Sequence, residues 1–154
     1  MQSQAISSKN KLEVDQFVTM TIGHQIFGIS VEYIVDILSQ QKINPIPLSR
    51  QEIIGSLNLR GRIVTALDIR VLLGLNDQPH LEKKMCVVVD HGSELFSLMV
   101  DKVGDVVHIP TNKLAKNPDN LNKLWQEISL GIFPMEDELV VILDITKVIT
   151  ILME

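Results

Sequence analysis

The sequence has one cysteine, few aromatic residues and no long apolar run, and each shortage argues against a class of protein. A single thiol, Cys86, cannot form an internal disulfide, which fits a reducing cytoplasm. Aromatic residues make up 4% of the chain and the formal net charge is −5, so nucleic-acid binding is not expected. No apolar run approaches the ~18 residues of a membrane span. The polar residues 1–12, which we expect to form a mobile tail, lack the apolar segment of a signal peptide.

Enzyme and metal motifs are also missing. None of the histidines, His24, His80, His91 and His108, lies four residues from another histidine or from the cysteine, as a metal site on a helix requires. No glycine-rich phosphate loop, dinucleotide fingerprint or nucleophile elbow occurs. Cys86 begins an apolar run, which favours an inert core thiol over a nucleophile. The sequence therefore predicts no catalytic residue, no metal site and no cofactor.

What the chain does contain is a series of short β-strand patterns, in an ordinary globular composition of 45% hydrophobic and 21% charged residues. Between Val14 and Ile22, apolar and polar residues alternate, as in a half-buried strand. The segment 31–37 predicts a short helix or a helical turn that enters a strand, whereas 43–48 contains two prolines and is an edge strand or an extended connector. Further strands are expected at 25–30, 85–90, 94–100, 105–109 and 139–143, with helices that begin at Asn117-Pro118 and Asp144.

The stretch around Arg60-Gly61-Arg62 predicts a tight hairpin that carries charge at its tip. Apolar residues run up to Leu59 and resume at Ile63, and Gly61 suits the positive φ that such a turn requires. Two cationic side chains are therefore held at the end of an apolar hairpin, which is an unusual place for charge.

An internal repeat organises these elements. The segment from Ile26 to Ile37 is similar to one 69 residues later, and the segment from Ile63 to Ile69 is similar to one 76 residues later. Two similar all-β units are therefore expected, at about 13–80 and 81–152, with the C-terminal helix closing the fold. Neither unit would bury enough apolar area alone, so we expect the two to pack on each other.

The repeat also indicates structural roles for single residues. Asp68 recurs as Asp144, and each precedes a short helix, so we expect both to cap helices. Gly55 recurs as Gly131 at the same offset. Residues that recur in both halves are more often structural than catalytic.

The two hairpin tips carry opposite charge. Glu136 and Glu138 take the places of Arg60 and Arg62 in the second half. Opposite charges on equivalent tips suit head-to-tail association, so Arg62, Glu136 and Glu138 are candidate residues of a partner or ring interface. The alternative is that these are solvated turn charges, worth about 0–1 kcal/mol in any pair.

Residues 55–70 resemble the signature of the CheW-like domain family of bacterial chemotaxis coupling proteins. The match is an Asn-x-Arg-Gly hairpin followed by an apolar strand and Leu-Asp-Ile-Arg. The segments 17–36 and 131–148 are similar to the family as well, so the resemblance covers residues 14–152. It implies an all-β fold with short helices, in which two SH3-like five-stranded β-barrel subdomains pack over a shared hydrophobic core.

The resemblance also implies a non-enzymatic adaptor in chemotaxis signal transduction. Members of this family connect the cytoplasmic tips of chemoreceptors to the regulatory domain of the histidine kinase CheA, which has the same fold. Receptor tips dock in the groove between the barrels, and the kinase contacts apolar surface of one barrel. Rings that contain CheW-like domains fit the head-to-tail geometry. The expected location is the cytoplasm, at membrane-associated receptor arrays.

Matching positions make seven residues candidates for receptor binding: Ile34, Asp36, Ile37, Asn58, Arg60, Gly61 and Val106. The resemblance implies that Asp36 and Arg60 form an ion pair beside the receptor groove, although Asp36 is one methylene shorter than the family's usual glutamate. A purely structural pair is the alternative.

Two other functions stay open. A CheW-like coupler can serve a non-flagellar chemosensory array, such as one that governs twitching motility or another output. A small β-barrel ligand-binding domain belongs to a different class, and it would need a closed polar pocket with perturbed titratable groups.

Overall fold

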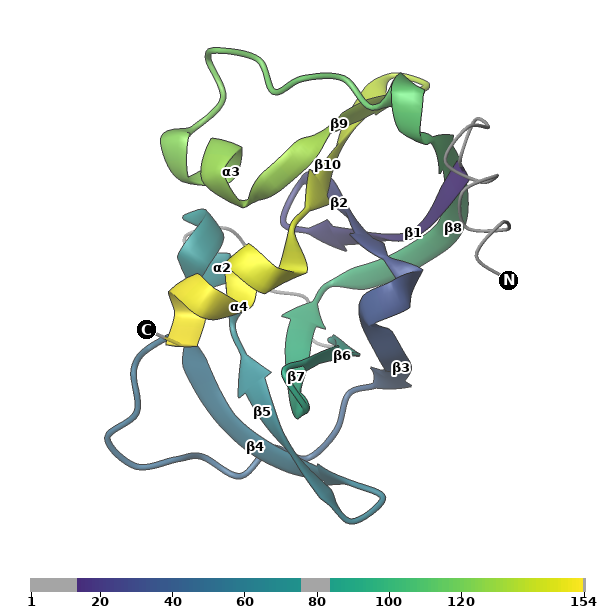
Figure 1. Ribbon diagram of the computed structural model, residues 1–154. Helices are drawn as coiled ribbons and strands as arrows, with labels where there is room; N and C mark the ends of the chain where they lie inside the picture. The colour runs from purple at the N-terminus through teal and green to yellow at the C-terminus, as the bar shows by residue number, and fades with distance from the viewer. Residues whose placement is uncertain (1–13, 76–83, 154) are drawn as a thin grey trace.

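The computed structural model describes residues 14–75 and 84–153, which form two five-stranded β-sheets with short helices (Figure 1). The expected tail at 1–12 lies outside the described residues. In chain order the elements are β1 (Val14–Ile22), β2 (Gln25–Ser30), η1 (Val31–Tyr33), β3 (Ile34–Ser39), β4 (Ile53–Leu59), β5 (Arg62–Leu67), α2 (Ile69–Leu73), β6 (Met85–His91), β7 (Glu94–Val100), β8 (Lys102–Pro110), η2 (Thr111–Lys113), α3 (Lys123–Ile128), β9 (Ser129–Met135), β10 (Glu138–Leu143) and α4 (Ile145–Met153). The predicted all-β class with short helices and two five-stranded units is confirmed.

The two sheets have the same strand arrangement. Sheet A has the order β8-β1-β2-β10-β9, and sheet B has the order β3-β6-β7-β5-β4. Neighbouring strands are antiparallel except for β2 with β10 and β5 with β7, which are parallel. Exchanging each strand of the first half with the strand numbered five higher converts either sheet into the other. The internal repeat is therefore confirmed in three dimensions.

The halves of the chain are interleaved, which differs from the expected division into units at 13–80 and 81–152. The first half contributes β1 and β2 to sheet A but β3, β4 and β5 to sheet B, and the second half does the reverse. Each sheet thus contains strands from both sides of residue 80. The physical reason is the parallel pairing across halves, which local sequence patterns do not encode.

Two glycines recur because connectors pass close to the sheets. Asn44 pairs with β4 beside Gly55, and Ala115 pairs with β9 beside Gly131. A Cβ on Gly55 would lie 2.2 Å from the carbonyl oxygen of Asn44, and one on Gly131 would lie 2.6 Å from that of Ala115. No side chain fits at either distance, so the close approach requires glycine.

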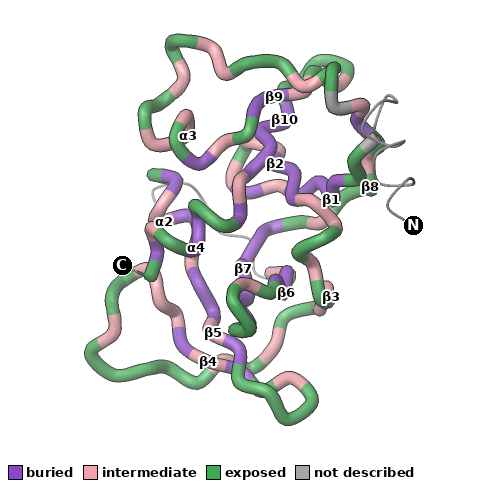
Figure 2. Tube along the Cα trace, in the orientation of Figure 1, coloured by how far each residue is buried: buried purple, intermediate pink, exposed green. Residues whose placement is uncertain are grey.

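The shared core lies between the two sheets and accounts for most of the buried apolar residues (Figure 2). Helix α4 closes this core, as expected, because Ile145, Val148, Ile149 and Leu152 follow the 3.6-residue period of one helix face and are all buried. Each sheet also has a smaller apolar cluster of its own.

Of the three helix starts predicted at Asp68, Asn117 and Asp144, the structure confirms the first and the third. Asp68 accepts a hydrogen bond from the backbone N–H of Arg70 at 3.0 Å, and Asp144 accepts one from that of Lys147 at 3.3 Å. The expected helix start at Asn117-Pro118 is wrong, because α3 begins at Lys123 after the cap Asn122. The bridge from Ala115 to Ile132 holds the chain along β9, the edge strand of sheet A, and the residues that follow form the long loop that leads to α3 in Figure 1.

Trp125 of α3 packs against the shared core. Its indole N–H donates to the backbone carbonyl of Leu73 at 3.0 Å, which ties α3 to the end of α2. Its ring meets Phe27 edge-on, with 5.4 Å between the ring centroids.

A buried ion cluster, which the sequence did not reveal, connects the two sheets. Asp101, at the end of β7, accepts from Arg70 at 3.0 Å and from Lys84 at 2.7 Å. The same carboxylate accepts at 2.8 Å from the backbone N–H of Gly23, in the turn between β1 and β2 of the other sheet. The side chains of Arg70 and Asp101 are buried, and that of Lys84 is nearly so. We call Arg70, Lys84 and Asp101 the ion cluster.

The ion cluster lowers the pKa of Asp101. Burial alone raises that pKa, but hydrogen bonds from Lys84 and Gly23 and the charges of Lys84 and Arg70 more than offset it. A carboxyl whose pKa is lower in the folded than in the unfolded chain stabilises the fold above its unfolded pKa. That stabilisation is lost as the pH falls through the folded pKa.

We expect Asp101→Asn to lower the free energy of unfolding by about 3–5 kcal/mol at pH 7, because it leaves the buried Arg70 and the partly buried Lys84 without a compensating charge. Urea unfolding at pH 7 and pH 3 measures this, with Asp90→Asn at an exposed position as the matched control. From pH 7 to pH 3, the free energy of unfolding should fall further in the wild type than in Asp101→Asn, because only the wild type has the Asp101 carboxylate to protonate. An Asp101→Asn protein as stable as the control would contradict the role of the cluster.

Candidate functional site

The β4–β5 hairpin ends in a two-residue turn formed by Arg60 and Gly61. Leu59 pairs with Arg62, and the φ angles of Arg60 and Gly61 are 51° and 85°. Positive φ at both central residues defines the type I′ turn, whose twist matches that of the flanking strands. Asn58 supports it, since its side-chain oxygen accepts from the backbone N–H of Gly61 at 2.9 Å. The predicted tight hairpin is confirmed.

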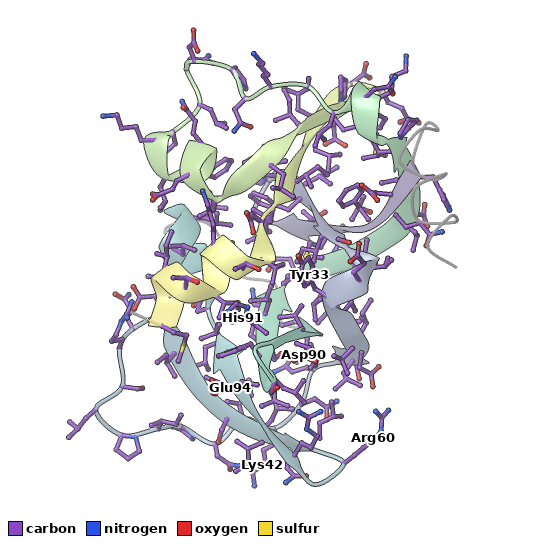
Figure 3. The ribbon with its side chains drawn as sticks, viewed as in Figure 1. Tyr33, Lys42, Arg60, Asp90, His91 and Glu94 are labelled. Carbon is purple, nitrogen blue, oxygen red and sulfur yellow. The ribbon has the colours of Figure 1, made fainter. Side chains whose placement is uncertain are left out.

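Arg60 and Asp36 form the ion pair that the resemblance implied. The guanidinium lies 2.9 Å from one carboxylate oxygen of Asp36, and the other oxygen accepts from the backbone N–H of Ile37 at 2.8 Å. The shorter aspartate side chain therefore still reaches the arginine. The side chain of Arg60 is 74% exposed and that of Asp36 23%, and Figure 3 shows Arg60 extending outward from the hairpin tip.

A β-bulge at Val35 sets which side chains of β3 face outward. Ile34 and Asp36 pair with the adjacent residues Val89 and Val88 of β6, so the register shifts by one between them. Without this shift Ile34 and Asp36 would share a face. With it, Ile34 and Ile37 pack against the shared core, while Val35 is exposed.

The structure thus brings together most of the predicted receptor-binding residues. Asn58, Arg60 and Gly61 form the hairpin tip, and Asp36 touches it from β3. Val106 is exposed on β8, which is an edge strand of the other sheet. Sequence reasoning missed the exposed Val35, because a bulge is invisible in the alternation of residue types.

The interface candidates lie at two separate hairpin tips. Arg62 follows the β4–β5 turn, and its guanidinium donates to the carbonyl of Ser93 at 3.4 Å. Glu136 opens the β9–β10 turn with φ 52°, close to the 51° of its counterpart Arg60, and Glu138 is exposed beside it. Figure 1 shows the two hairpins pointing to opposite ends of the molecule. The molecule therefore has a cationic tip at one end and an anionic tip at the other.

Within residues 14–75 and 84–153, no group of three or more His, Cys, Asp or Glu side chains could hold a metal ion. The same part of the chain has no helix that is long and apolar enough to cross a membrane.

The fold and its tips define a β-protein of two interleaved five-stranded sheets with charged hairpins at both ends. A comparison with family profiles matches residues 16–152 to the CheW-like domain. The chain belongs to the CheW-like domain family. The resemblance drawn from residues 55–70 is thereby confirmed over nearly the whole chain.

Curated relatives agree with this assignment, and a solved structure has the same fold. The chain is 28% identical to the chemotaxis protein CheW of Thermotoga maritima, over 87% of each chain. It is 24% identical to the chemotaxis protein CheW of Klebsiella aerogenes, over 88% of this chain and 81% of that protein. The crystal structure of the scaffolding protein TtCheW from Thermoanaerobacter tengcongensis superposes with a TM-score of 0.79 at 20% identity, covering 90% of this chain and 89% of that one.

We expect the Arg60–Asp36 pair to add little to stability. An exposed ion pair contributes about 0–1 kcal/mol, and arginine is a poor residue for a positive φ. Arg60→Asn gives the Asn-Gly sequence that type I′ turns prefer. Its free energy of unfolding should lie within about 1 kcal/mol of the wild-type value or above it. Thermal unfolding measures this. A loss of several kcal/mol would mean that the pair is a structural element.

Proposed function

We propose that this protein is a coupling adaptor that connects the cytoplasmic tips of chemoreceptors to the regulatory domain of a CheA-type histidine kinase. The observation that carries the proposal is the match of residues 16–152 to the CheW-like domain, together with an exposed Arg60–Asp36 pair at the signature hairpin. The adaptor binds its partners without enzymatic activity or a cofactor. It works in the cytoplasm, at receptor arrays attached to the membrane.

The receptor surface, in this proposal, consists of the hairpin tip and β3, with Val106 of β8 at its border. Arg60 supports this role because its side chain is mostly in solvent and its pairing adds little to folding. The neighbouring Ile34 and Ile37 are only partly buried and offer apolar area next to the charges. Charge with adjacent apolar surface suits the docking of a receptor tip, where the charges give specificity and the apolar area gives affinity.

The second part of the proposal concerns assembly with other CheW-like domains. The cationic tip with Arg62 and the anionic tip with Glu136 and Glu138 point to opposite ends of one rigid fold. Contacts between unlike ends are heterologous, and they close into rings when the rotation per subunit allows it.

A non-flagellar chemosensory array, such as one for twitching motility, is the second candidate setting. The chain is 24% identical to Protein PilI of Pseudomonas aeruginosa, over 75% of this chain and 65% of that protein. Deleting the gene and scoring swimming and twitching separately distinguishes the two outputs.

Receptor binding should depend on the tip, and kinase binding should not. We expect Arg60→Asn and Asp36→Asn each to weaken binding to a receptor cytoplasmic fragment at least about tenfold, the loss of ~1.4 kcal/mol of contact energy. The affinity of both variants for the kinase regulatory domain should stay within about twofold of the wild-type affinity. Isothermal titration of the purified proteins measures both, with Lys147→Asn on α4 as an exposed control. Unchanged receptor affinity in both tip variants would exclude this surface.

Assembly should respond to the charge of the tips. Arg62→Glu and Glu138→Arg should each reduce the amount of this protein that sediments with receptor and kinase, and the double variant should restore it because the charges are again complementary. If all three variants sediment like wild type, the charged ends take no part in assembly.

A further inference from the structure

A cavity of about 220 Å³ lies at the end of the β4–β5 hairpin that is opposite to the tip. Ile54, the second residue of β4, and Asp68, which follows the last residue of β5, both line it. Figure 1 shows α2, which begins after Asp68, at this end of the hairpin. Sites for drug-sized ligands occupy ~300–1,000 Å³, so the cavity suits a smaller molecule.

The walls of the cavity are held in place by hydrogen bonds between distant parts of the chain. Asn44 exchanges two backbone hydrogen bonds of 2.8 Å with Ser56, so the connector from β3 follows β4. The side-chain oxygen of Gln40 accepts from the backbone N–H of Lys84 at 3.3 Å, which joins the start of that connector to the start of β6. A site formed before binding loses little entropy when a ligand docks.

Part of the cavity wall is apolar. Ile43 and Ile54 are only partly buried, although both pack against the smaller apolar cluster of sheet B. The buried Met99 of β7 lines the same cavity. Methionine is flexible and fills irregular gaps, so it adapts to the shape of a bound group. This part of the wall suits a short branched hydrocarbon chain.

The rest of the wall carries charges of both signs. The ammonium group of Lys84 has three N–H donors, and among the described residues Asp101 accepts from one of them, at 2.7 Å. One carboxylate oxygen of the half-buried Asp68 accepts from the backbone N–H of Arg70, whereas the other accepts from no described residue. Lys84 and Asp68 form no ion pair with each other within 4 Å, although both line the cavity.

Gln40 adds a neutral polar group to this part of the wall. Because its oxygen accepts from Lys84, its NH₂ group remains as a donor. Gln40 and Lys84 together offer donors to a carboxylate, and Asp68 offers an acceptor to an ammonium group. An α-amino acid carries these two groups on one carbon atom.

We propose that the cavity binds a free aliphatic α-amino acid such as leucine or valine. The carboxylate of the ligand binds Lys84 and Gln40, and its ammonium group binds Asp68. Its side chain packs against Ile43 and Ile54. This site goes beyond the coupling function, because it gives the protein a small-molecule ligand.

A zwitterion fits the wall better than a simple ion or a hydrocarbon does. An inorganic anion such as phosphate is attracted by Lys84 and Arg70 but repelled by Asp68, and a metal cation is repelled by the two cations. A hydrocarbon without polar groups leaves the charges of the wall desolvated and unpaired. A molecule with both charges and a short apolar chain satisfies every part of the wall.

Three variants of the full chain test the site. Asp68→Asn removes the negative charge and keeps a residue that caps helices as well as aspartate does, so the variant should fold. Gln40→Glu, at an exposed position, replaces the donor by a carboxylate that repels the carboxylate of the ligand. Asp144→Asn is the matched control, because it makes the same change at the equivalent cap of α4, which does not line the cavity.

Isothermal titration with L-leucine measures the affinity, and two analogues test the charges. Isocaproate is leucine without its ammonium group, and isoamylamine is leucine without its carboxylate. We expect wild type to bind leucine with a Kd below about 1 mM and each analogue at least about tenfold more weakly, because each leaves one charge of the wall unpaired. Asp68→Asn and Gln40→Glu should each bind leucine at least about tenfold more weakly, and Asp144→Asn within about twofold of wild type.

A Kd above about 1 mM for both leucine and valine overturns the proposal. Wild-type leucine affinity in Asp68→Asn or Gln40→Glu also overturns it, because the ligand is then bound elsewhere. Isocaproate that binds as tightly as leucine has the same consequence, since the ammonium group is then not recognised. These titrations contain neither receptor nor kinase, so their outcome is independent of the proposed coupling function.

Discussion

Two parallel strand pairs, β2 with β10 and β5 with β7, join the halves of this chain. Each pair links a strand of one half to a strand of the other, so neither sheet is complete without both halves. Such distant pairings are unfavourable in entropy until the core behind them is formed. The shared apolar core and the ion cluster around Asp101 lie where the sheets meet and stabilise the joined arrangement.

This interleaving has a consequence for docking. Because both sheets depend on the same core, hairpin tips and connectors of either sheet keep fixed positions relative to each other. The β4–β5 tip lies at one end of β4, and the cavity lined by Ile54 lies at the other end.

The tip residues proposed for binding contribute little to folding. Arg60 and Glu136 both have positive φ, although neither is glycine or asparagine. A sequence selected for stability alone would place Asn or Gly there. The strain is local and small compared with the interactions of the buried core, so the fold tolerates it.

Local patterns by themselves determined much of the architecture. Alternation predicted the bounds of β1, the Arg-Gly turn marked the hairpin, and Asp68 and Asp144 marked helix starts, because each depends on neighbours within a few residues. The Arg60–Asp36 contact followed from the family signature. Only the tertiary structure decided that the halves interleave, that a bulge turns Val35 outward, and that Asp101 is shared by two cations. These features arise from pairings between residues far apart in the chain, whose energies no local pattern contains.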